Sequence, residues 1–458
     1  MIRWLYDLGF LFFGIASLPH FLMRLGQAED AGRLLRERFG FLSPEYLART
    51  RKGPCLWIHG VSVGEILAVE KFLRLILEKR PDLHVTLTTV TPTGQRLAKR
   101  WEGNQVHVFY FPFDLRGAVS RFFETLKPSA LLLVETEIWP NVLWEAARRQ
   151  VPVGVVNGRI SDRSFRSFRR FSFLFRPLLE KIDLFLVQTE IDRERLLDLG
   201  AAPSKVTVTG NMKLDAFESN DQFNQDPAGL RRKWGFLPAD SILIGGSTHQ
   251  GEEEILLRAL RRLRGEGFPS LKLLLAPRHI ERAGKVMQQA RAEGFETILA
   301  SVSPHPSLSP RGGEGGGEGV KNPQYPTFDV LILDVLGELR KLYAMGDAVF
   351  MGGSLVPHGG QNPVEPAALL RPVLHGPWVF NFQEIYRRLD EEGAVLRVNG
   401  EEELFFGLKR IFASQREREH LGRRAYEVLS ELRGASERNF DRINQWIGRE
   451  NYEPIHTA

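Results

Sequence analysis

Short β-rich runs that alternate with amphipathic helical stretches constrain the fold of this chain more than any other feature. Each of six apolar runs in the first half is followed by a polar or helix-like pattern, and these runs are residues 55–59, 84–90, 106–111, 130–135, 153–157 and 184–188. Five similar runs follow in the second half, at residues 242–245, 271–276, 330–333, 348–351 and 372–375. This alternation predicts α/β domains in which helices cover parallel sheets.

A polar, turn-rich break at residues 217–227 separates the two series of runs. Because a domain takes roughly 150 residues, the chain length fits two large domains. We therefore expect two Rossmann-like, doubly wound domains, residues 25–217 and 228–458, that face a cleft and bind ligands at the carboxyl ends of their strands. The Gly-, Pro- and Ser-rich segment 301–326 is expected to be a flexible surface loop inserted in the second domain.

The first 24 residues form a segment unlike the rest of the chain. An uncharged stretch, residues 8–23, lies between Arg3 and Arg24. About 20 apolar residues are needed to span a bilayer, and the stretch reaches that length only by including residues before Asp7, whose carboxylate is costly in lipid unless it is paired. We expect residues 1–24 to be a retained membrane anchor that either spans the bilayer or lies in its interface. A buried first helix of the domain is the alternative.

The composition sets limits on partners and cofactors. The 61 Lys and Arg against 56 Asp and Glu leave a net charge of +5, a mild excess that does not demand nucleic acid. The single cysteine, Cys55, excludes an intramolecular disulfide and a Cys-rich metal site, and it favours a reducing compartment. The histidines have no HxxxH or HExxH spacing and no suitable DxD motif follows a strand, so no metal and no other cofactor is expected.

The first predicted strand runs into the sequence WIHGVSVGE at residues 57–65, where a helix is expected to begin. Small residues here, including Ser62, let a substrate approach the backbone. Glu65 would lie at the mouth of the cleft, where a carboxylate can act as general base toward a substrate hydroxyl. The alternative is a glutamate that only complements the helix dipole.

A second pair of carboxylates follows the predicted strand at residues 130–135. Glu135 and Glu137 would point the same way from an extended chain. They could stabilise the positive charge of an oxocarbenium-like transition state of a sugar or bind hydroxyls of the donor. A capping and salt-bridging pair is the alternative.

Residues 163–176 contain five Arg and five Phe, which would lie on opposite sides of one basic amphipathic helix. Such a helix suits an anionic membrane surface or a phosphorylated lipid. The candidates for contact with an acceptor lipid or the membrane are Arg163, Arg166 and Arg170. An ordinary helix with a solvated Arg face is the alternative.

In the second half, polar and glycine residues again follow successive predicted strands. Together they predict a nucleotide-sugar donor site, because Arg278 can pair with a phosphate and the amides of a helix start can hold an anion. For any one motif, a simple helix cap is the alternative. The candidate donor-binding residues are Pro277, Arg278, Gly337, Glu338, Leu339, Asn362, Pro363, Val364 and Glu365.

These motifs occur in the order HGVSVGE, VETEIWPN, NGRIS, TGNMKLD, GGSTHQGEEE, APRH, LGEL and GGSLVPHGGQNPVEPA. In this order they resemble the 3-deoxy-D-manno-octulosonic acid (Kdo) transferases of lipopolysaccharide synthesis, over residues 55 to about 375. The resemblance implies a GT-B glycosyltransferase fold and a metal-independent, inverting transfer of Kdo from CMP-Kdo to the lipid A precursor, lipid IVA. It places the enzyme at the cytoplasmic face of a Gram-negative inner membrane.

Matched motif by motif, the resemblance makes Glu65 the base and Glu135 the transition-state stabiliser, and it assigns contacts with CMP to the nine candidate donor-binding residues. The chain departs from the family at Gly60-Val61, where Ala-Ala is common, and in the insertion 301–326. Another membrane-associated GT-B transferase that uses a UDP-sugar, or a non-catalytic sugar-nucleotide binding protein, remains the alternative function.

Overall fold

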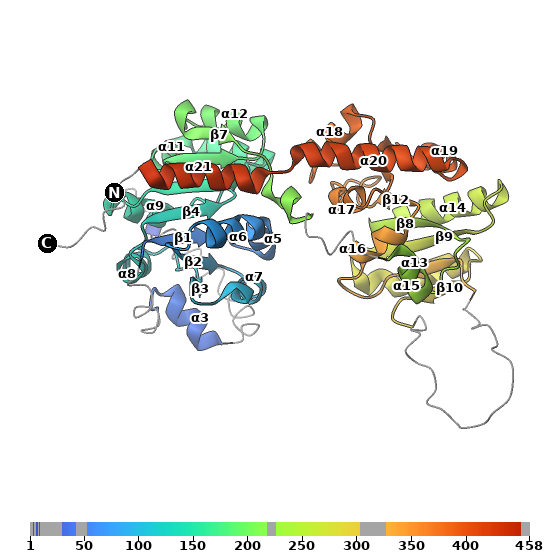
Figure 1. Ribbon diagram of the computed structural model, residues 1–458, viewed down its shortest axis with the longest axis horizontal. Coiled ribbons are helices and arrows are strands. Elements are labelled where there is room, and N and C mark those ends of the chain that lie inside the picture. The colour runs from blue at the N-terminus through green and yellow to red at the C-terminus, as the bar shows by residue number, and fades with distance from the viewer. Residues whose placement is uncertain are drawn as a thin grey trace, which may run out of the picture. The chain divides into compact units, whose positions relative to one another are not determined.

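The computed structural model describes residues 30–42, 53–217, 226–302 and 327–449, together with Arg3, Tyr6, Asp7 and Gly9. The chain divides into two compact units, one formed by residues up to 216 and from 432 onward, the other by residues 217–431. Each unit contains a parallel sheet with helices packed against it (Figure 1). The prediction of two Rossmann-like α/β domains is therefore confirmed.

In the described part of the first unit, seven parallel strands form one sheet in the order β3-β2-β1-β4-β5-β6-β7. The strand order reverses direction between β1 and β4, and in doubly wound sheets ligands bind beside such a switch point. The short strand β7 was not predicted. The strands are β1 (Cys55–His59), β2 (His84–Thr89), β3 (Val106–Tyr110), β4 (Ala130–Val134), β5 (Val153–Gly158), β6 (Leu184–Val187) and β7 (Val206–Val208).

Helices cover both faces of this sheet, because side chains of a strand alternate between its faces. Trp57 and Leu131 pack on one face with helices α8, α9, α11 and α12, while Ile58 and Leu132 pack on the other with α5, α6, α7 and α21. The helices are α3 (Ala31–Arg38), α5 (Val63–Ala68), α6 (Glu70–Lys79), α7 (Pro92–Ala98), α8 (Arg116–Leu126), α9 (Pro140–Arg148), α10 (Asp162–Arg170), α11 (Ser172–Leu179), α12 (Glu190–Asp198) and α21 (Ala435–Arg449), with 3-10 turns η2 (Lys99–Trp101), η3 (Pro203–Lys205) and η4 (Met212–Phe217).

The carboxyl-terminal helix α21 shows that the predicted bounds of the second domain, residues 228–458, are wrong. This helix packs on the first unit, beside α6, although it follows the whole second unit in the sequence (Figure 1). Its apolar side chains Phe440, Ile443 and Ile447 are buried in the core that covers one face of the first sheet. Apolar periodicity predicts that a helix has a buried face, but it does not tell which sheet that face covers.

The second unit repeats the architecture. Its described strands form a seven-stranded parallel sheet in the order β10-β11-β9-β8-β12-β13-β14. The strands are β8 (Ser241–Thr248), β9 (Leu271–Pro277), β10 (Thr297–Leu299), β11 (Val330–Ile332), β12 (Ala348–Met351), β13 (Val373–His375) and β14 (Leu396–Arg397). The helices are α13 (Pro227–Lys233), α14 (Glu252–Gly265), α15 (Ala283–Ala292), α16 (Leu339–Leu342), α17 (Val364–Ala368), α18 (Gln383–Glu391), α19 (Glu401–Ala413) and α20 (Gln415–Leu432), with 3-10 turns η6 (Ile280–Arg282) and η7 (Tyr343–Met345).

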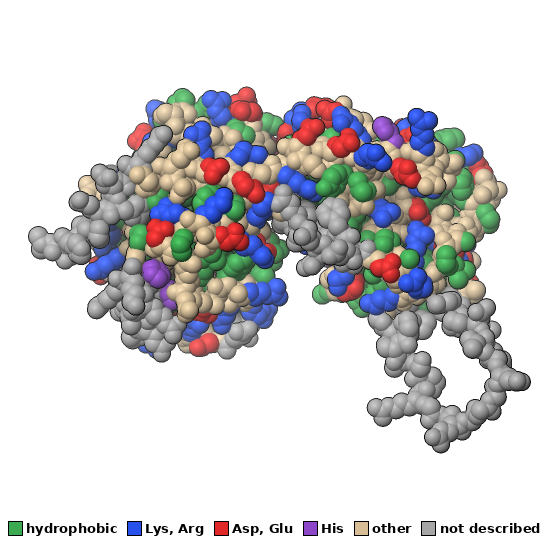
Figure 2. Space-filling view, viewed as in Figure 1, with side chains coloured by type: hydrophobic (Ala, Val, Ile, Leu, Met, Phe, Trp, Pro, Cys, Tyr) green, Lys and Arg blue, Asp and Glu red, His purple; other side chains and the backbone are tan. Residues whose placement is uncertain are grey.

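Charged side chains of both signs are interspersed over the face shown in Figure 2. Many form exposed ion pairs on one helix, such as Arg387 with Glu384 and Glu391, each with an N···O distance of 2.6 Å. Exposed pairs of this kind contribute little to stability. The net charge is therefore less informative than the position of individual charges near the strand ends.

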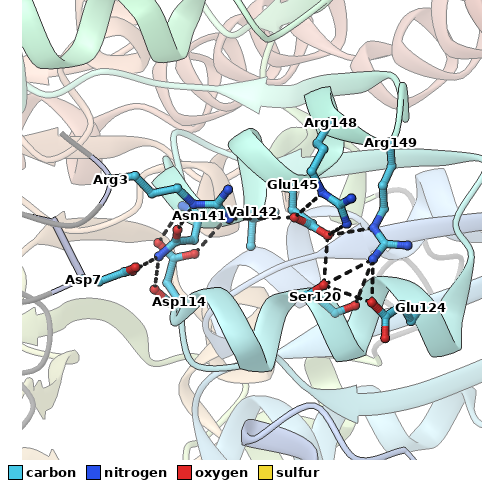
Figure 3. A network of polar contacts seen from close by, with 10 residues as sticks. All are labelled: Arg3, Asp7, Asp114, Ser120, Glu124, Asn141, Val142, Glu145, Arg148 and Arg149. Atoms are coloured by element: carbon cyan, nitrogen blue, oxygen red, sulfur yellow. Dashed lines mark hydrogen bonds and ion pairs between the residues drawn. The ribbon is translucent and has the colours of Figure 1, made fainter. Parts of the chain in front are cut away.

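The start of the chain is attached to the first unit by a polar network (Figure 3). Arg3 Nε donates to Asn141 Oδ1 at 2.9 Å, and Asn141 Nδ2 donates to Asp7 Oδ1 at 2.6 Å. Tyr6 donates its hydroxyl to the Asp114 carboxylate at 2.7 Å. The carboxylate of Asp7 is thus paired with a protein group.

Most of the predicted anchor, residues 1–24, and all but the first two residues of the predicted loop 301–326 lie outside the described residues. Within the ranges that are described, no helix combines the length and the apolar character needed to cross a membrane.

Replacing Asp114 by Ala is expected to lower the free energy of unfolding of the first unit by about 2–5 kcal/mol, because buried donors that lose their acceptor carry the full cost of desolvation. Asp114 is fully buried, and its carboxylate accepts hydrogen bonds from the amides of Asn141 and Val142, both at 3.1 Å. Denaturant unfolding measures the loss. Asp114→Asn keeps one acceptor and should lose less; an Ala variant as stable as the wild type would contradict this role.

Candidate functional site

Glu65 lies where β1 ends and α5 begins, and its side chain is held back over the loop between them. Its Oε2 accepts a hydrogen bond from the Val61 amide at 2.6 Å, and its Oε1 accepts one from the Ser62 hydroxyl at 2.9 Å. The residue is only 8% exposed. Ser62 was predicted to contact the acceptor substrate. Its hydroxyl instead donates to Glu65 within the loop, so Ser62 orients the predicted base.

The surroundings of Glu65 suit a proton acceptor. Burial raises the pKa of the Glu65 carboxyl above its usual value, and the nearby Glu135 carboxylate raises it further. The two hydrogen bonds from Val61 and Ser62 and the nearby Lys213 ammonium oppose this rise. A carboxylate whose pKa is raised is a stronger base once it is ionised, so Glu65 is well suited to take a proton from a substrate hydroxyl.

Glu135 lies directly after β4 and forms an ion pair with Lys213, with an Nζ···Oε1 distance of 2.6 Å. Its backbone has a positive φ of 61°, so the chain leaves the extended conformation at this residue. The prediction that Glu135 and Glu137 project from an extended strand is therefore wrong. Such a conformation costs a non-glycine residue of order 1–3 kcal/mol and is common at functional sites.

Lys213 belongs to this site and was not singled out from the sequence. It lies in η4, which is fixed because Asn157, at the end of β5, accepts a hydrogen bond from the Met212 amide at 2.9 Å. Asp215, in the same turn, accepts one from the Ser436 amide at the start of α21. The lysine was part of the motif TGNMKLD, but only the fold shows that its ammonium reaches the Glu135 carboxylate.

Glu137 adds a third carboxylate to the site. Burial, together with the Glu65 and Glu135 carboxylates, raises the pKa of Glu137 to about 7. This carboxyl group is thus partly protonated near neutral pH, which limits the repulsion among the three acids.

The raised pKa of Glu137 predicts a stability effect that depends on pH. Between about pH 4.5 and pH 7 the folded state binds a proton at Glu137 that the unfolded state has lost, so stability falls as pH rises through this window. Glu137→Gln should remove this loss. The midpoint of thermal unfolding of the variant should equal that of the wild type near pH 4 and exceed it at pH 8; equal midpoints at both pH values would contradict the assignment.

The Arg- and Phe-rich segment forms two helices, α10 and α11, which meet at Phe171, so the prediction of one continuous helix is wrong. Arg163, Arg166 and Arg170 are exposed, and Phe173 is 67% exposed. Phe165 and Phe168 instead pack partly against the core of the first unit. We call the exposed arginine, phenylalanine and leucine side chains of this segment the basic-aromatic surface: Arg163, Arg166, Arg169, Arg170, Phe171, Phe173, Leu174 and Arg176.

In the second unit, the predicted donor-binding residues lie at the carboxyl ends of neighbouring strands. Pro277 is the last residue of β9 and pairs with Thr248 of β8. The next residue, Arg278, donates its amide to the Thr248 carbonyl at 2.9 Å and leaves its side chain exposed. The guanidinium is thus available for an anionic ligand.

The other two predicted donor-binding loops, residues 337–339 and 362–365, lie close to each other. Gly337 has a positive φ of 84° and precedes Glu338 and Leu339 at the start of the four-residue helix α16. Burial raises the pKa of Glu365, and the nearby Arg340 guanidinium and Asn362 amide oppose this rise. Arg340, which follows the first loop, therefore lies close to the carboxylate of the second.

Asn362, Pro363 and Val364 form the turn that leads into α17. Asn362 Oδ1 accepts a hydrogen bond from the Val364 amide at 3.1 Å, which fixes the turn locally. Pro363 and Val364 are buried, whereas Asn362 and Glu365 are partly exposed. The two polar members of this motif are therefore the ones accessible to a ligand.

Known proteins resemble this chain in sequence. The family model for 3-deoxy-D-manno-octulosonic-acid transferase (kdotransferase) matches residues 33–216. The 3-deoxy-D-manno-octulosonic acid transferase of Haemophilus influenzae is 35% identical over 416 residues, which cover 91% of this chain and 92% of the relative. The transferase of the same name from Bordetella pertussis is 31% identical over 400 residues, which cover 86% and 87%.

A solved structure supports the fold alone. The UDP-GlcNAc 2-epimerase of Neisseria meningitidis, bound to UDP-GlcNAc, superposes with a TM-score of 0.56 at 12% sequence identity. The match covers 87% of this chain and 100% of the epimerase. The two-domain, Rossmann-like architecture is thus shared with proteins that handle nucleotide sugars by other chemistry, so the fold does not determine the reaction.

Proposed function

The chain belongs to the Kdo transferase family, glycosyltransferases of lipopolysaccharide biosynthesis, and from this premise we propose that it moves Kdo from CMP-Kdo to lipid IVA, the lipid A precursor, with inversion at the anomeric carbon. The observation that carries the proposal is Glu65, a buried and oriented carboxylate beside the Glu135–Lys213 ion pair. The first unit would hold the acceptor and the second the donor.

Glu65 is the proposed general base. It would take the proton of the acceptor hydroxyl as the oxygen of that hydroxyl attacks the anomeric carbon of Kdo. Glu135 is the proposed transition-state stabiliser, since its carboxylate can offset positive charge that develops on the sugar ring. The Lys213 ammonium, 2.6 Å from Glu135 Oε1, would hold this carboxylate in place.

The nine predicted donor-binding residues are proposed to bind CMP, as in the family. Arg278 would meet the phosphate, because its guanidinium is exposed at the end of β9. The leaving group, CMP, carries a single phosphate, whose charge one guanidinium and backbone amides can balance. We therefore expect the reaction to need no metal ion and no other cofactor.

The acceptor lipid implies a membrane location, and the cytoplasmic face of the inner membrane is the proposed one. The segment 1–24 is the proposed anchor. Because Arg3, Tyr6 and Asp7 contact the first unit, the part proposed to enter lipid is the uncharged stretch 8–23. This stretch is shorter than the roughly 20 residues that a span requires, which favours an interfacial anchor.

The basic-aromatic surface is proposed to contact anionic lipid headgroups. Replacing Arg163, Arg166 and Arg170 together by Gln should weaken binding to anionic vesicles about 100-fold, since each basic side chain near such a surface contributes about 1 kcal/mol. Vesicle co-sedimentation measures the effect, which should vanish on neutral vesicles. Three exposed arginines of the second unit, Arg397, Arg416 and Arg423, provide the control triple variant; equal losses in both variants would contradict the assignment.

Nucleotide release tests the proposed donor. The purified chain, incubated with lipid IVA, should release CMP from CMP-Kdo and no UDP from UDP-GlcNAc. Release of UDP alone would identify a transferase of another donor class. Tight donor binding without release of either nucleotide would identify a sugar-nucleotide binding protein.

A further inference from the structure

His249 lies directly after β8, between the predicted donor loops, and the proposed mechanism does not use it. Only 9% of this residue is exposed. Its position is fixed through its backbone, since its amide donates to Glu252 Oε2 at 2.8 Å and its carbonyl accepts from the Glu252 amide at 3.0 Å. The imidazole therefore occupies a defined place in the second unit.

The carboxylate of Glu252 also holds the loop that follows β12. The amides of Gly353, Ser354 and Leu355 donate to this carboxylate at 2.7, 3.0 and 3.0 Å. With the His249 amide, this carboxylate accepts four backbone hydrogen bonds and joins two strand-end loops. One acid of the motif GGSTHQGEEE, Glu252, thus binds backbone amides of the protein. The imidazole of His249, in the same motif, lies between the two loops.

The adjacent acid, Glu253, fixes a third loop. Its Oε1 accepts hydrogen bonds from the Thr248 hydroxyl at 3.0 Å and from Arg282 at 2.9 Å. Arg282 ends the turn that starts after β9, so the segment that contains Arg278 is tied to the same helix start. The loops after β8, β9 and β12 are thus held together around His249.

Three imidazole rings meet in this region. His249 stacks on His358, with ring centroids 4.2 Å apart and ring planes inclined by 14°, and it meets His279 edge-on with centroids 6.0 Å apart. The amide nitrogen of Gln361 lies 3.5 Å from His249 Nε2. His358 and His279 are exposed, so the cluster opens to solvent.

The backbone also approaches the ring closely. A β-carbon at Gly353 would lie 3.2 Å from His249 Cδ2, and the positive φ of 68° at this residue further favours glycine. A ligand that follows this glycine loop would therefore pass directly beside the imidazole.

One cation near the ring is available to an anion. Arg278 and Arg282 both lie near His249; Arg282 is paired with Glu253, whereas the Arg278 side chain is exposed. Burial, with contributions from these neighbours, lowers the pKa of His249 to about 4. The ring is thus neutral at physiological pH, and its N–H can donate one hydrogen bond to an anionic ligand.

We propose that His249 donates a hydrogen bond to the carboxylate of the Kdo group and so selects a donor whose sugar is an acid. This inference rests on the proposed function. CMP-Kdo carries two anionic groups, its phosphate and its sugar carboxylate, and Arg278 is already assigned to the first. An uncharged sugar such as that of UDP-GlcNAc offers no carboxylate and would leave the imidazole N–H without this acceptor.

The test compares the KM for CMP-Kdo with the inhibition constant of CMP, which has the phosphate but lacks the Kdo group and its carboxylate. For His249→Ala we expect the KM to rise at least tenfold, because a hydrogen bond to a charged group contributes about 1.5–3 kcal/mol. The inhibition constant of CMP should change less than about twofold. His249→Gln keeps an N–H donor and should recover part of the loss, while His420→Ala, an exposed histidine of α20, is the control.

Three results would overturn the inference. The first is a KM within twofold of the wild type, and the second is a parallel rise in the KM and in the inhibition constant of CMP, which would indicate contact with the phosphate or a purely structural role. The third is a His249→Gln variant whose KM does not recover and whose thermal unfolding midpoint falls as far as that of His249→Ala. A wild-type chain that does not turn over CMP-Kdo at all would instead overturn the proposed function and this inference with it.

Discussion

Replacing Glu65 by Gln is expected to lower kcat for Kdo transfer by about 10²- to 10⁴-fold, the usual contribution of a positioned general base. Glutamine has nearly the same shape: its amide oxygen can still accept the hydrogen bond from the Val61 amide, and its NH2 group can donate to the Ser62 hydroxyl. It cannot take a proton. The loss should therefore appear in kcat, measured by release of CMP at saturating donor and acceptor.

The matched control for Glu65 is Ser62→Ala, which removes one of the two hydrogen bonds that orient the carboxylate. The Val61 amide still holds the carboxylate in this variant, so it should lose much less kcat than Glu65→Gln. CMP should bind both variants as it binds the wild type, because Glu65 and the donor loops belong to different units. Retained turnover in Glu65→Gln would remove Glu65 as the base.

Replacing Glu135 by Gln or Lys213 by Met is expected to lower kcat by about 10²-fold in either case, as is typical when one preorganised electrostatic group is removed. The two side chains form an ion pair of 2.6 Å, and each is partly exposed. Removing the lysine leaves the Glu135 carboxylate without its cation, and removing the carboxylate leaves the ammonium beside a developing positive charge.

A double-mutant cycle separates this pair from two independent residues. Because the two groups act together, the double variant should lose much less than the product of the two single losses. Glu190→Gln, which breaks an exposed ion pair with Arg193 on α12, is the control and should leave kcat unchanged. Losses that multiply in the double variant would show that Lys213 does not act through Glu135.

The sequence predicts the parts of this molecule that depend on local pattern. The apolar runs correspond to β1 to β6 of the first sheet and to five strands of the second, and Glu65 and Arg278 lie at strand ends as expected. Strands β7, β10 and β14 were missed. A strand of two or three residues carries little periodicity and was predicted only where it lies in a four-residue run, as β11 and β13 do. The roles of the site residues stay predictions until the variants are measured.

Contacts between distant parts of the chain could not be predicted. Asp215 accepts a hydrogen bond from Ser436, 221 residues later, and this contact helps to place both α21 and the turn that carries Lys213. No local pattern contains such information. The break between α10 and α11 was missed for a related reason, since Phe165 and Phe168 turn toward the core whereas Phe173 does not.

The central claim is that this chain transfers Kdo from CMP-Kdo to a lipid acceptor, and mass spectrometry of the product tests it most directly. Purified protein incubated with CMP-Kdo and lipid IVA should yield lipid IVA that carries one or more Kdo groups, with one CMP released for each group added. Unmodified lipid IVA, together with a product formed from UDP-GlcNAc, would contradict the account.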